Sequence, residues 1–349
     1  MTAKRFTAFT AAVAILFCTG CNYNRIIIGN QPSDSALAVA TAADATVTDA
    51  TATDATATDA TGTDAATVLS LTNQTPPMTY DFSQLKYSVN STAVSCFDVR
   101  ENRFLYQKHT LTRISPASLT KIVTASVALK FVDPATVFTV GEEVKLAQSN
   151  SSLCFILPGH QVTLYDLLCG MLLASGNDAA YTIAVNVARI VSGSALDTAS
   201  AVAYFVGLMN RYAEEIELTG SHFVNPEGWD DPEQYMTLKD IIVAALFAMQ
   251  YGPFREIVGK SSYAATFVSG QTITWKNSNQ MMDPSTSFFL EGIRGIKTGT
   301  TALAKKCLIA FYEDGNRELI IASMGNTTDE ERYFSIREII DTIKYQSGE

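Results

Sequence analysis

Histidine is scarce in this chain of 349 residues, which contains only His109, His160 and His222. Three scattered histidines do not supply a histidine-rich metal centre, so the sequence predicts no metal site and no other cofactor. Positive charge is also in short supply: no Lys or Arg occurs between Arg25 and Lys86, and the formal net charge is -10. Such acidity argues against a nucleic-acid partner.

The cysteines beyond the N-terminus show no paired spacing. Two cysteines lie close to the N-terminus, and the remaining four lie in apolar surroundings: Cys96, Cys154, Cys169 and Cys307. We interpret these four as mostly buried thiols rather than as a disulfide framework or a metal site. The protein is predicted below to be exported, and export permits disulfides without requiring them.

The N-terminus indicates export. Lys4 and Arg5 precede an apolar segment, residues 6–17, which has the length of a signal-peptide core and is too short to span a bilayer as a helix. The segment ends at Cys18-Thr19-Gly20-Cys21, and small residues before a cysteine resemble the bacterial lipobox. We therefore expect a signal peptide over 1–20, lipid on Cys21 and an extracytoplasmic protein anchored to the bacterial membrane by that lipid. An ordinary secretory signal cut nearby is the alternative.

Residues 33–71 are nearly all Ala, Thr, Asp and Val, with an aspartate every five residues from Asp44 to Asp64. A period of five advances about 140° per repeat on a helix, so no apolar face forms. The repeated carboxylates also repel one another. We predict a disordered tether over 21–79, followed by a folded domain over 80–349.

The domain reads as helices enclosed between strands. The hydrophobic pattern predicts strands near 87–99, 104–107, 264–268, 295–298, 307–312 and 319–324. It predicts helices from residue 118, over 163–174, to about 190 after a break, and over 198–216, 237–250 and 329–344. This order favours an α+β fold in which the first and last segments form an antiparallel sheet flanked by helices, with an inserted all-helical lobe.

One candidate nucleophile opens the first helix. Ser118-Leu119-Thr120-Lys121 places a hydroxyl and an amine one helical turn apart, which suits a nucleophile and its base. The same pattern occurs at Ser83 and Lys86, but Ser83 leads into a predicted strand at the edge of the domain, with no helix to hold the lysine in register. We interpret Ser83 as a surface residue. An N-cap serine beside a solvated lysine is the ordinary interpretation of Ser118, and motifs downstream favour catalysis instead.

Two further motifs follow in order. Ser175-Gly176-Asn177 lies in the break between helices, and Lys297-Thr298-Gly299 ends a strand. With the first motif they form the set shared by class A β-lactamases and penicillin-binding proteins. The wording around them, in residues 115–125, 175–180, 223–226 and 295–299, resembles the serine D-Ala-D-Ala carboxypeptidases among the low-molecular-mass penicillin-binding proteins, and the resemblance covers most of 85–345.

The resemblance implies a β-lactamase/transpeptidase-like fold and a role for each motif. It implies Ser118 as acyl nucleophile, Lys121 as general base, Ser175 and Asn177 as partners in proton transfer and substrate binding, and Lys297 as the residue that completes the site. A lysine acts as a base only when its amine is partly neutral. Burial together with the second cation, Lys297, is expected to lower the pKa of Lys121.

Chemistry also suggests how the substrate is held. The backbone N–H groups of Ser118 and Thr300 are candidates for an oxyanion hole. The strand that ends at Gly299 is a candidate for pairing with an extended peptide, while the Thr298 hydroxyl meets its terminal carboxylate.

Two positions depart from the family pattern. Glu227 stands in Asn225-Pro226-Glu227-Gly228, where the family commonly has Asn-Pro-His-Gly, and Asn326 stands where some members carry a carboxylate-binding arginine. Both leave the substrate preference open.

The sequence thus predicts an enzyme that trims the terminal D-Ala from peptidoglycan stem peptides ending in D-Ala-D-Ala, through an acyl-enzyme on Ser118, with β-lactams as covalent inhibitors. One alternative is a β-lactamase of the same fold, although the chain contains no Glu-x-x-Leu-Asn element of the kind that activates water in class A enzymes. Another alternative is a catalytically silent module that senses β-lactams.

Overall fold

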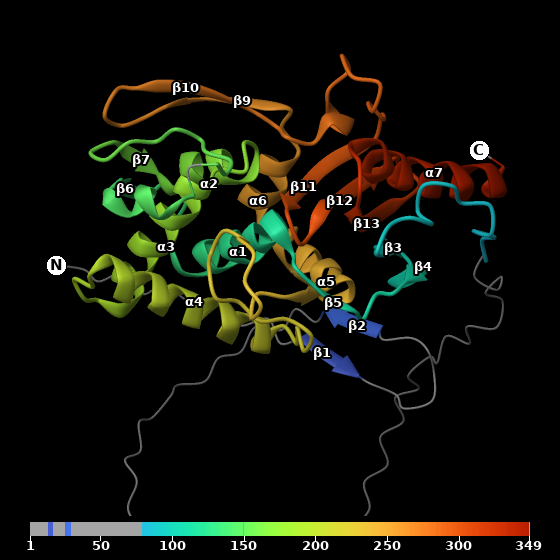
Figure 1. Ribbon diagram of the computed structural model, residues 1–349, viewed down its shortest axis with the longest axis horizontal. Helices are drawn as coiled ribbons and strands as arrows, with labels where there is room; N and C mark the ends of the chain where they lie inside the picture. Colours follow the sequence, from blue (N-terminus) through green and yellow to red (C-terminus); the bar gives the residue numbers. More distant parts are fainter. Residues whose placement is uncertain (1–12, 17–24, 29–78, 149, 349) are drawn as a thin grey trace, which may run out of the picture. The chain divides into compact units, whose positions relative to one another are not determined.

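The computed structural model describes residues 13–16, 25–28, 79–148 and 150–348 (Figure 1). Val13–Leu16 (β1) and Arg25–Ile28 (β2) pair in a two-stranded sheet. The rest of the predicted signal peptide, Cys21 and nearly all of the predicted tether lie outside the described residues.

A five-stranded antiparallel sheet organises the part of the chain from residue 79. Its strands, in spatial order, are β11 (Ile293–Thr301), β12 (Lys305–Glu313), β13 (Glu318–Asn326), β3 (Ala93–Asp98) and β4 (Arg103–Lys108). The first strands of the domain therefore pair with the last, as the sequence predicted. Short two-stranded pairs lie outside this sheet: β5 (Arg113–Ile114) with β8 (Met236–Thr237), β6 (Val137–Thr139) with β7 (Gln161–Thr163), and β9 (Ser262–Thr266) with β10 (Thr272–Lys276).

Helices fill the interval between β4 and β11 and close the chain. They are α1 (Lys121–Phe131), α2 (Leu164–Leu172), α3 (Asn177–Ser192), α4 (Thr198–Glu215), α5 (Leu238–Ala248), α6 (Gly252–Val258) and α7 (Asp329–Ser347), with short 3₁₀ helices η1 (Ala117–Thr120), η2 (Glu142–Leu146) and η3 (Gln280–Met282). In Figure 1 the sheet and α7 lie on the right, the lobe of α2, α3 and α4 lies on the left, and α1 lies between them.

The two faces of the sheet build two apolar cores. In β12, Ile309 and Phe311 belong to the core shared with the helical lobe, whereas Leu308 and Ala310 belong to the core under α7. This alternation follows from the two-residue period of a strand, and it explains why β12 and β13 read as nearly continuous apolar runs. Helix α1 is buried over most of its length, so its polar side chains, Lys121 among them, lie inside the protein.

The strand predicted over 87–99 forms only from Ala93. The carboxylate of Glu338, on α7, accepts hydrogen bonds from the backbone N–H groups of residues 86–88, and the amine of Lys108 donates to the carbonyls of Ser88, Val89 and Ser91. Two side chains thus satisfy backbone groups that a neighbouring strand would otherwise satisfy. Strand β3 itself lies inside the sheet, between β13 and β4.

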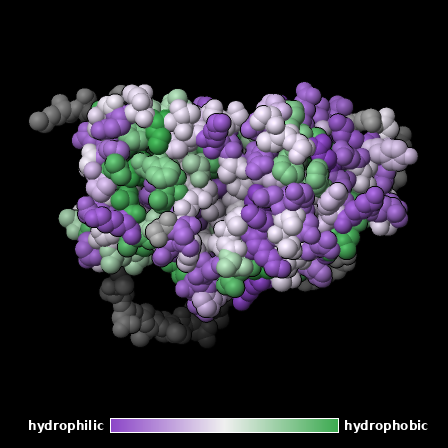
Figure 2. Space-filling model, turned by 45° about the horizontal axis from the view of Figure 1, so that its top comes forward, coloured by the Kyte–Doolittle hydropathy of each residue, from purple (hydrophilic) through white to green (hydrophobic). Residues whose placement is uncertain are grey.

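In the described part of the chain, no single helix is both long enough and apolar enough to cross a membrane. Helices α5 and α6 reach that length and apolar character only as a pair, and the chain bends by 112° between them. Apolar side chains are spread unevenly over the face of the molecule that Figure 2 draws. Figure 2 shows most of them on the left of that face, over the helical lobe, whereas hydrophilic side chains dominate on the right.

Candidate active site

The candidate nucleophile lies in a tight turn before α1. Ser118 belongs to η1, and its side chain is partly exposed, whereas Lys121 is the first residue of α1 and is buried. The sequence predicted that both residues share one turn of α-helix. The structure instead places them across the junction of a 3₁₀ turn and the helix, and this junction keeps them on the same side.

Lys121 connects three segments: its own motif, the Ser175-Gly176-Asn177 motif and the loop that contains Glu227. Its amine donates to the Ser118 hydroxyl at 3.0 Å, to Oδ1 of Asn177 at 2.6 Å and to the backbone carbonyl of Glu227 at 2.8 Å. The three acceptors come from η1, from the start of α3 and from the loop that precedes β8. The amine is therefore held beside the hydroxyl from which a base would remove the proton.

Burial lowers the pKa of Lys121 to about 8, and the nearby carboxylates of Glu227 and Asp178 oppose this shift. The sequence predicted that burial and Lys297 together would lower it. Burial does so, but the repulsion between the two amines lowers the pKa of Lys297, which burial already holds well below its usual range. At neutral pH a fraction of Lys121 amines is thus uncharged, as a general base requires.

The second motif is held by the loop before it. Ser175 adopts a left-handed φ of 62°, and Asn177 begins α3 with its N–H donating to the carbonyl of Ser152. The carboxylate of Asp178 accepts from the N–H groups of Cys154 and Ile156. These contacts fix the loop against the start of α3, so that Asn177 Oδ1 faces Lys121.

The third motif lies on β11, which forms one edge of the five-stranded sheet and pairs within it only with β12. The amine of Lys297 is buried and donates to the carbonyl of Thr298, whose hydroxyl lies 2.6 Å from that of Ser278. Arg332, a buried arginine on α7, adds to the positive field that lowers the pKa of Lys297. Sequence reasoning missed Arg332, because only tertiary packing brings α7 to this edge.

Two glycines allow the backbone to approach the nucleophile closely. A Cβ on Gly299 would lie 3.0 Å from the Ala117 Cβ and 3.3 Å from the Ser118 nitrogen. A Cβ on Gly228 would lie 1.8 Å from the Ala117 carbonyl oxygen, and Gly228 has a φ of 92° that favours glycine. The turn that carries Ser118 is therefore packed between β11 and the Asn225–Gly228 loop. Thr300, the other predicted oxyanion donor, follows Gly299 and is exposed.

Asp230 joins three segments around the site. One carboxylate oxygen accepts from the hydroxyls of Ser115 and Thr301, both at 2.6 Å, and the other accepts from the Leu303 N–H at 2.9 Å. Asp230 thus holds the residues before the nucleophile to the end of β11. No motif in the sequence pointed to this aspartate.

The two departures from the family pattern lie in different places. Glu227 lines the site, with its carboxyl Oε1 accepting from the Tyr181 hydroxyl at 3.2 Å. Asn326 instead belongs to a buried network behind β13, where its Oδ1 accepts from the hydroxyls of Ser91 and Ser323. An arginine does influence Lys297, but it is Arg332, six residues after Asn326, and it acts in addition to Lys121.

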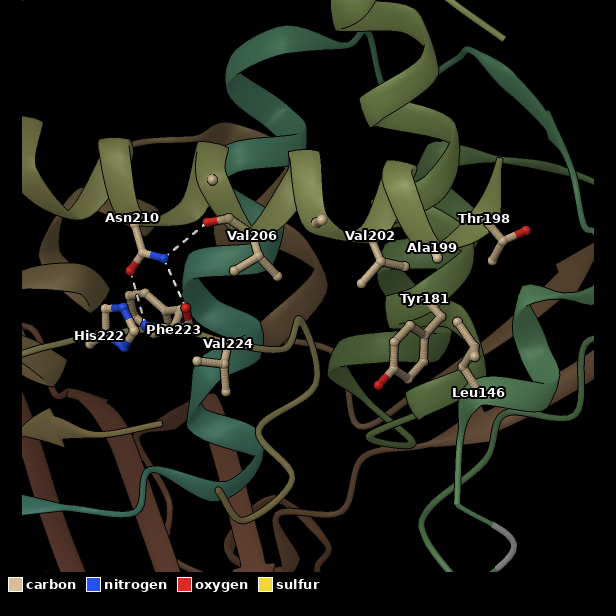
Figure 3. A pocket seen from close by; sticks show the side chains of 12 residues that line it. Leu146, Tyr181, Thr198, Ala199, Val202, Val206, Asn210, His222, Phe223 and Val224 are labelled. Atoms are coloured by element: carbon tan, nitrogen blue, oxygen red, sulfur yellow. Dashed lines mark hydrogen bonds between the residues drawn. The ribbon is translucent and has the colours of Figure 1, made fainter. Parts of the chain in front are cut away.

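A cavity of about 540 Å³ opens onto these groups. Its lining includes Ser118, Asn177, Glu227, Asp230 and Thr300. A second hollow, of about 830 Å³, lies along α4 and is mostly apolar; it is lined by Tyr181 of α3, Leu146 of η2 and a row of α4 side chains (Figure 3). Tyr181 thus borders the α4 hollow, while its hydroxyl contacts a residue that lines the first cavity.

The described residues include no group of three or more His, Cys, Asp or Glu side chains placed to hold a metal ion. The four cysteines from residue 79 onward are buried and unpaired. The site does contain the Ser118 hydroxyl beside the buried Lys121 amine, whose pKa is lowered, and the Asn177 side-chain amide accepts a hydrogen bond from the same amine. A second buried amine, that of Lys297, lies at the sheet edge. This arrangement suits acyl transfer through a serine ester without histidine or metal.

Comparisons with known proteins agree with this chemistry. A sequence model of a protein family described as D-alanyl-D-alanine carboxypeptidase matches residues 80–328. The chain is 32% identical over 255 residues to D-alanyl-D-alanine carboxypeptidase DacC of Escherichia coli (strain K12), covering 70% of this chain and 59% of that protein. It is 28% identical over 243 residues to DacF of Bacillus subtilis (strain 168), covering 68% and 58%. The chain therefore spans less than three fifths of the length of these two relatives.

The fold also matches a solved structure. The crystal structure of the Streptomyces K15 DD-transpeptidase superposes with a TM-score of 0.66 at 29% identity, covering 72% of this chain and 96% of that one. The predicted β-lactamase/transpeptidase-like fold, with its antiparallel sheet and inserted helical lobe, is thereby confirmed.

Proposed function

Because the chain belongs to the D-alanyl-D-alanine carboxypeptidase family, we propose that it is a serine hydrolase that removes the terminal D-Ala from peptidoglycan stem peptides ending in D-Ala-D-Ala. The observation that carries the proposal is the position of the Lys121 amine, which is buried and hydrogen-bonded to both the Ser118 hydroxyl and Asn177. A solvated N-cap serine with a surface lysine would show neither feature.

In the proposed reaction, Ser118 Oγ attacks the carbonyl carbon of the penultimate D-Ala while neutral Lys121 takes the hydroxyl proton. The N–H groups of Ser118 and Thr300 stabilise the oxyanion. When the tetrahedral intermediate collapses, its C–N bond breaks and Lys121 returns the proton to the leaving amine, with Ser175 and Asn177 beside the path. A water molecule then attacks the ester, and the proton it loses returns to Ser118.

Substrate orientation follows from the edge strand. The free edge of β11 suits an extended peptide added as a further strand. The guanidinium of Arg332 supplies positive charge for the terminal carboxylate, and the Lys297 amine and the Thr298 hydroxyl supply hydrogen-bond donors. These groups select a peptide with a free C-terminus.

Turnover tests the proposal directly. The protein is incubated with a pentapeptide ending in D-Ala-D-Ala, and free D-Ala is measured. We expect Ser118→Ala to abolish release and Ser83→Ala to leave it unchanged, because only Ser118 has an amine beside it. Loss of release in Ser83→Ala with full release in Ser118→Ala would show that the wrong serine was chosen.

β-Lactams enter the proposal as covalent inhibitors. The opened ring of a penicillin stays attached after Ser118 attacks, so it blocks the approach of water that a departing D-Ala leaves open. We expect a penicilloyl adduct on a peptide containing Ser118 that persists for minutes after free drug is removed, as measured by mass spectrometry. Rapid repeated hydrolysis without an adduct would favour the β-lactamase alternative, with Glu227 as the carboxyl that activates water.

Release of D-Ala also separates an enzyme from a sensor module. A silent β-lactam-binding module would form the penicilloyl adduct and release no D-Ala. Both readings share Ser118 acylation, so the peptide assay decides between them.

We also propose that the mature protein is held at the outer face of the bacterial membrane by lipid on Cys21. The support is the sequence of residues 4–21 alone. Cys21→Ala is expected to move the protein from the membrane fraction to the soluble fraction, because the apolar segment over 6–17 is too short to give a stable membrane span by itself. Membrane retention of this variant after signal cleavage would contradict the lipid anchor.

A further inference from the structure

Glu227 is an acid buried in the candidate active site without a charged contact. Only 2% of the residue is exposed, and among the described atoms its Oε2 has no hydrogen-bond partner. The Lys121 amine binds the backbone carbonyl of Glu227 rather than the carboxyl. The carboxyl therefore influences the amine through space, inside a region from which most water is excluded.

The charged neighbours of Lys121 come from several elements. Glu227, from the loop before β8, and Asp178, from α3, both favour the protonated amine. Cys154 also lies near the amine, but burial raises the pKa of its thiol well above the usual value, so it stays uncharged. Lys297, on β11, lies close enough that the positive charge of Lys121 lowers its pKa. The Asp178 carboxylate accepts hydrogen bonds from the backbone N–H groups of Cys154 and Ile156, in the loop before β7, and so needs its charge to hold that loop. Among the described residues, Glu227 accepts no backbone hydrogen bond of this kind, so its protonation state can change without releasing the loop.

Tyr181 is the other group that acts on Glu227. Its hydroxyl donates to Glu227 Oε1, and a hydrogen bond of this kind stabilises the ionised carboxylate. Burial acts in the opposite direction and raises the pKa of Glu227, while Lys121 and Tyr181 lower it. Tyr181 therefore helps to keep a negative charge beside the amine that has to become neutral.

From this geometry we propose that Glu227 and Tyr181 are positioning residues that set the proton affinity of Lys121, and so fix the lowest pH at which Ser118 is acylated efficiently. The inference rests on the proposed function, in which neutral Lys121 is the base. An ionised Glu227 keeps the proton on Lys121 and slows acylation at acidic pH. Removal of that charge makes the amine neutral at lower pH.

The test is a pH profile of Glu227→Gln, which removes the charge and keeps the shape. Two rates are measured against pH: kcat/KM for D-Ala release from the pentapeptide, and the rate of Ser118 acylation by a fluorescent penicillin. We expect the acidic limb of both profiles to move down by about one pH unit, which raises both rates about tenfold at a pH below the wild-type limb. The alkaline plateau should stay unchanged. Glu233→Gln is the matched control, because Glu233 is an exposed carboxylate on the same loop.

Tyr181→Phe gives an independent measurement if Glu227→Gln folds poorly. Loss of the hydroxyl should move the limb in the same direction by a smaller amount. In the double variant, Tyr181→Phe should add nothing to the shift of Glu227→Gln, because the tyrosine acts only through the acid.

Two outcomes overturn the inference, and a third contradicts only the proposed function. A limb that stays in place in Glu227→Gln and Tyr181→Phe, with the fold intact, shows that the pair does not tune Lys121. Loss of D-Ala release at every pH with normal penicillin acylation shows that Glu227 serves the hydrolytic step instead. Absence of D-Ala release from the wild-type protein contradicts the proposed function alone, because the acylation profile still tests the inference.

Discussion

Gly228 offers the most direct test of how the nucleophile is held. It occupies a left-handed conformation and lies against the carbonyl of Ala117, the residue immediately before Ser118. In Gly228→Ala the new Cβ would lie 1.8 Å from the Ala117 oxygen, whereas real Cβ contacts are essentially never shorter than 3.0 Å. The two segments must therefore separate by about 1 Å or more.

The structure allows the size of the effect to be worked out. An alanine at this φ costs about 1–3 kcal/mol of backbone strain, and forced separation of packed groups costs about 1–3 kcal/mol more. A shift of about 1 Å in the turn that carries a nucleophile lowers the rate about 100-fold. Gly228→Ala should therefore lose both stability and acylation rate.

Gly270 provides a matched control. It lies in the turn between β9 and β10 with a φ of 95°, close to that of Gly228, and no atom lies within 4 Å of its added Cβ. Gly270→Ala carries the same kind of strain without the clash. Acylation by a fluorescent penicillin and urea unfolding are measured for both variants. An acylation rate for Gly228→Ala within twofold of that for Gly270→Ala would refute the close packing of the loop against the nucleophile turn.

Three further predictions concern stability. Asp230→Ala removes the acceptor of the Ser115 and Thr301 hydroxyls and of the Leu303 N–H, so the free energy of unfolding should fall by about 1–3 kcal/mol in urea titration. An unchanged value would contradict the role of Asp230 in joining the segments. Glu338→Gln removes one of the two oxygens that accept hydrogen bonds from the backbone N–H groups of residues 86–88, so the free energy of unfolding should fall by about 1–3 kcal/mol. Glu330→Gln, at an exposed position on the same helix, should leave it unchanged. Burial lowers the pKa of Lys121 from 10.5 to about 8, so between pH 8 and 10.5 the unfolded state binds more protons than the folded state. The free energy of unfolding of the wild type should therefore rise relative to that of Lys121→Met as the pH increases from 8 to 10.5. A difference that stays flat or falls would contradict this prediction.

The fold class and the main motifs were readable because they depend on local patterns. The three-residue spacing of Ser118 and Lys121 keeps them on one side even though a 3₁₀ turn replaces the first turn of helix. The short apolar runs in β12 and β13 predicted strands, and the apolar period in α4 predicted a helix. These signals act within a few residues.

What the sequence could not show depends on contacts between distant segments. Asp230 meets Ser115 across 115 positions and Tyr181 meets Glu227 across 46, and no local pattern encodes either contact. The strand predicted over 87–92 failed for the same reason, because Glu338 of α7 takes its N–H groups. Arg332 reaches the site only after α7 packs on the sheet.

The order of strands in the sheet also bears on when the protein becomes active during its own synthesis. Strand β3 is made early, but its partner β13 ends at Asn326, so the centre of the sheet waits for nearly the whole chain. The helices of the lobe rely on nearby contacts and can form first, whereas pairing across such a long loop is slow. Lys297 and the edge of β11 join Ser118 only at that late step. A chain whose last hairpin has not yet folded therefore has Ser118 in place without the strand that completes the candidate site.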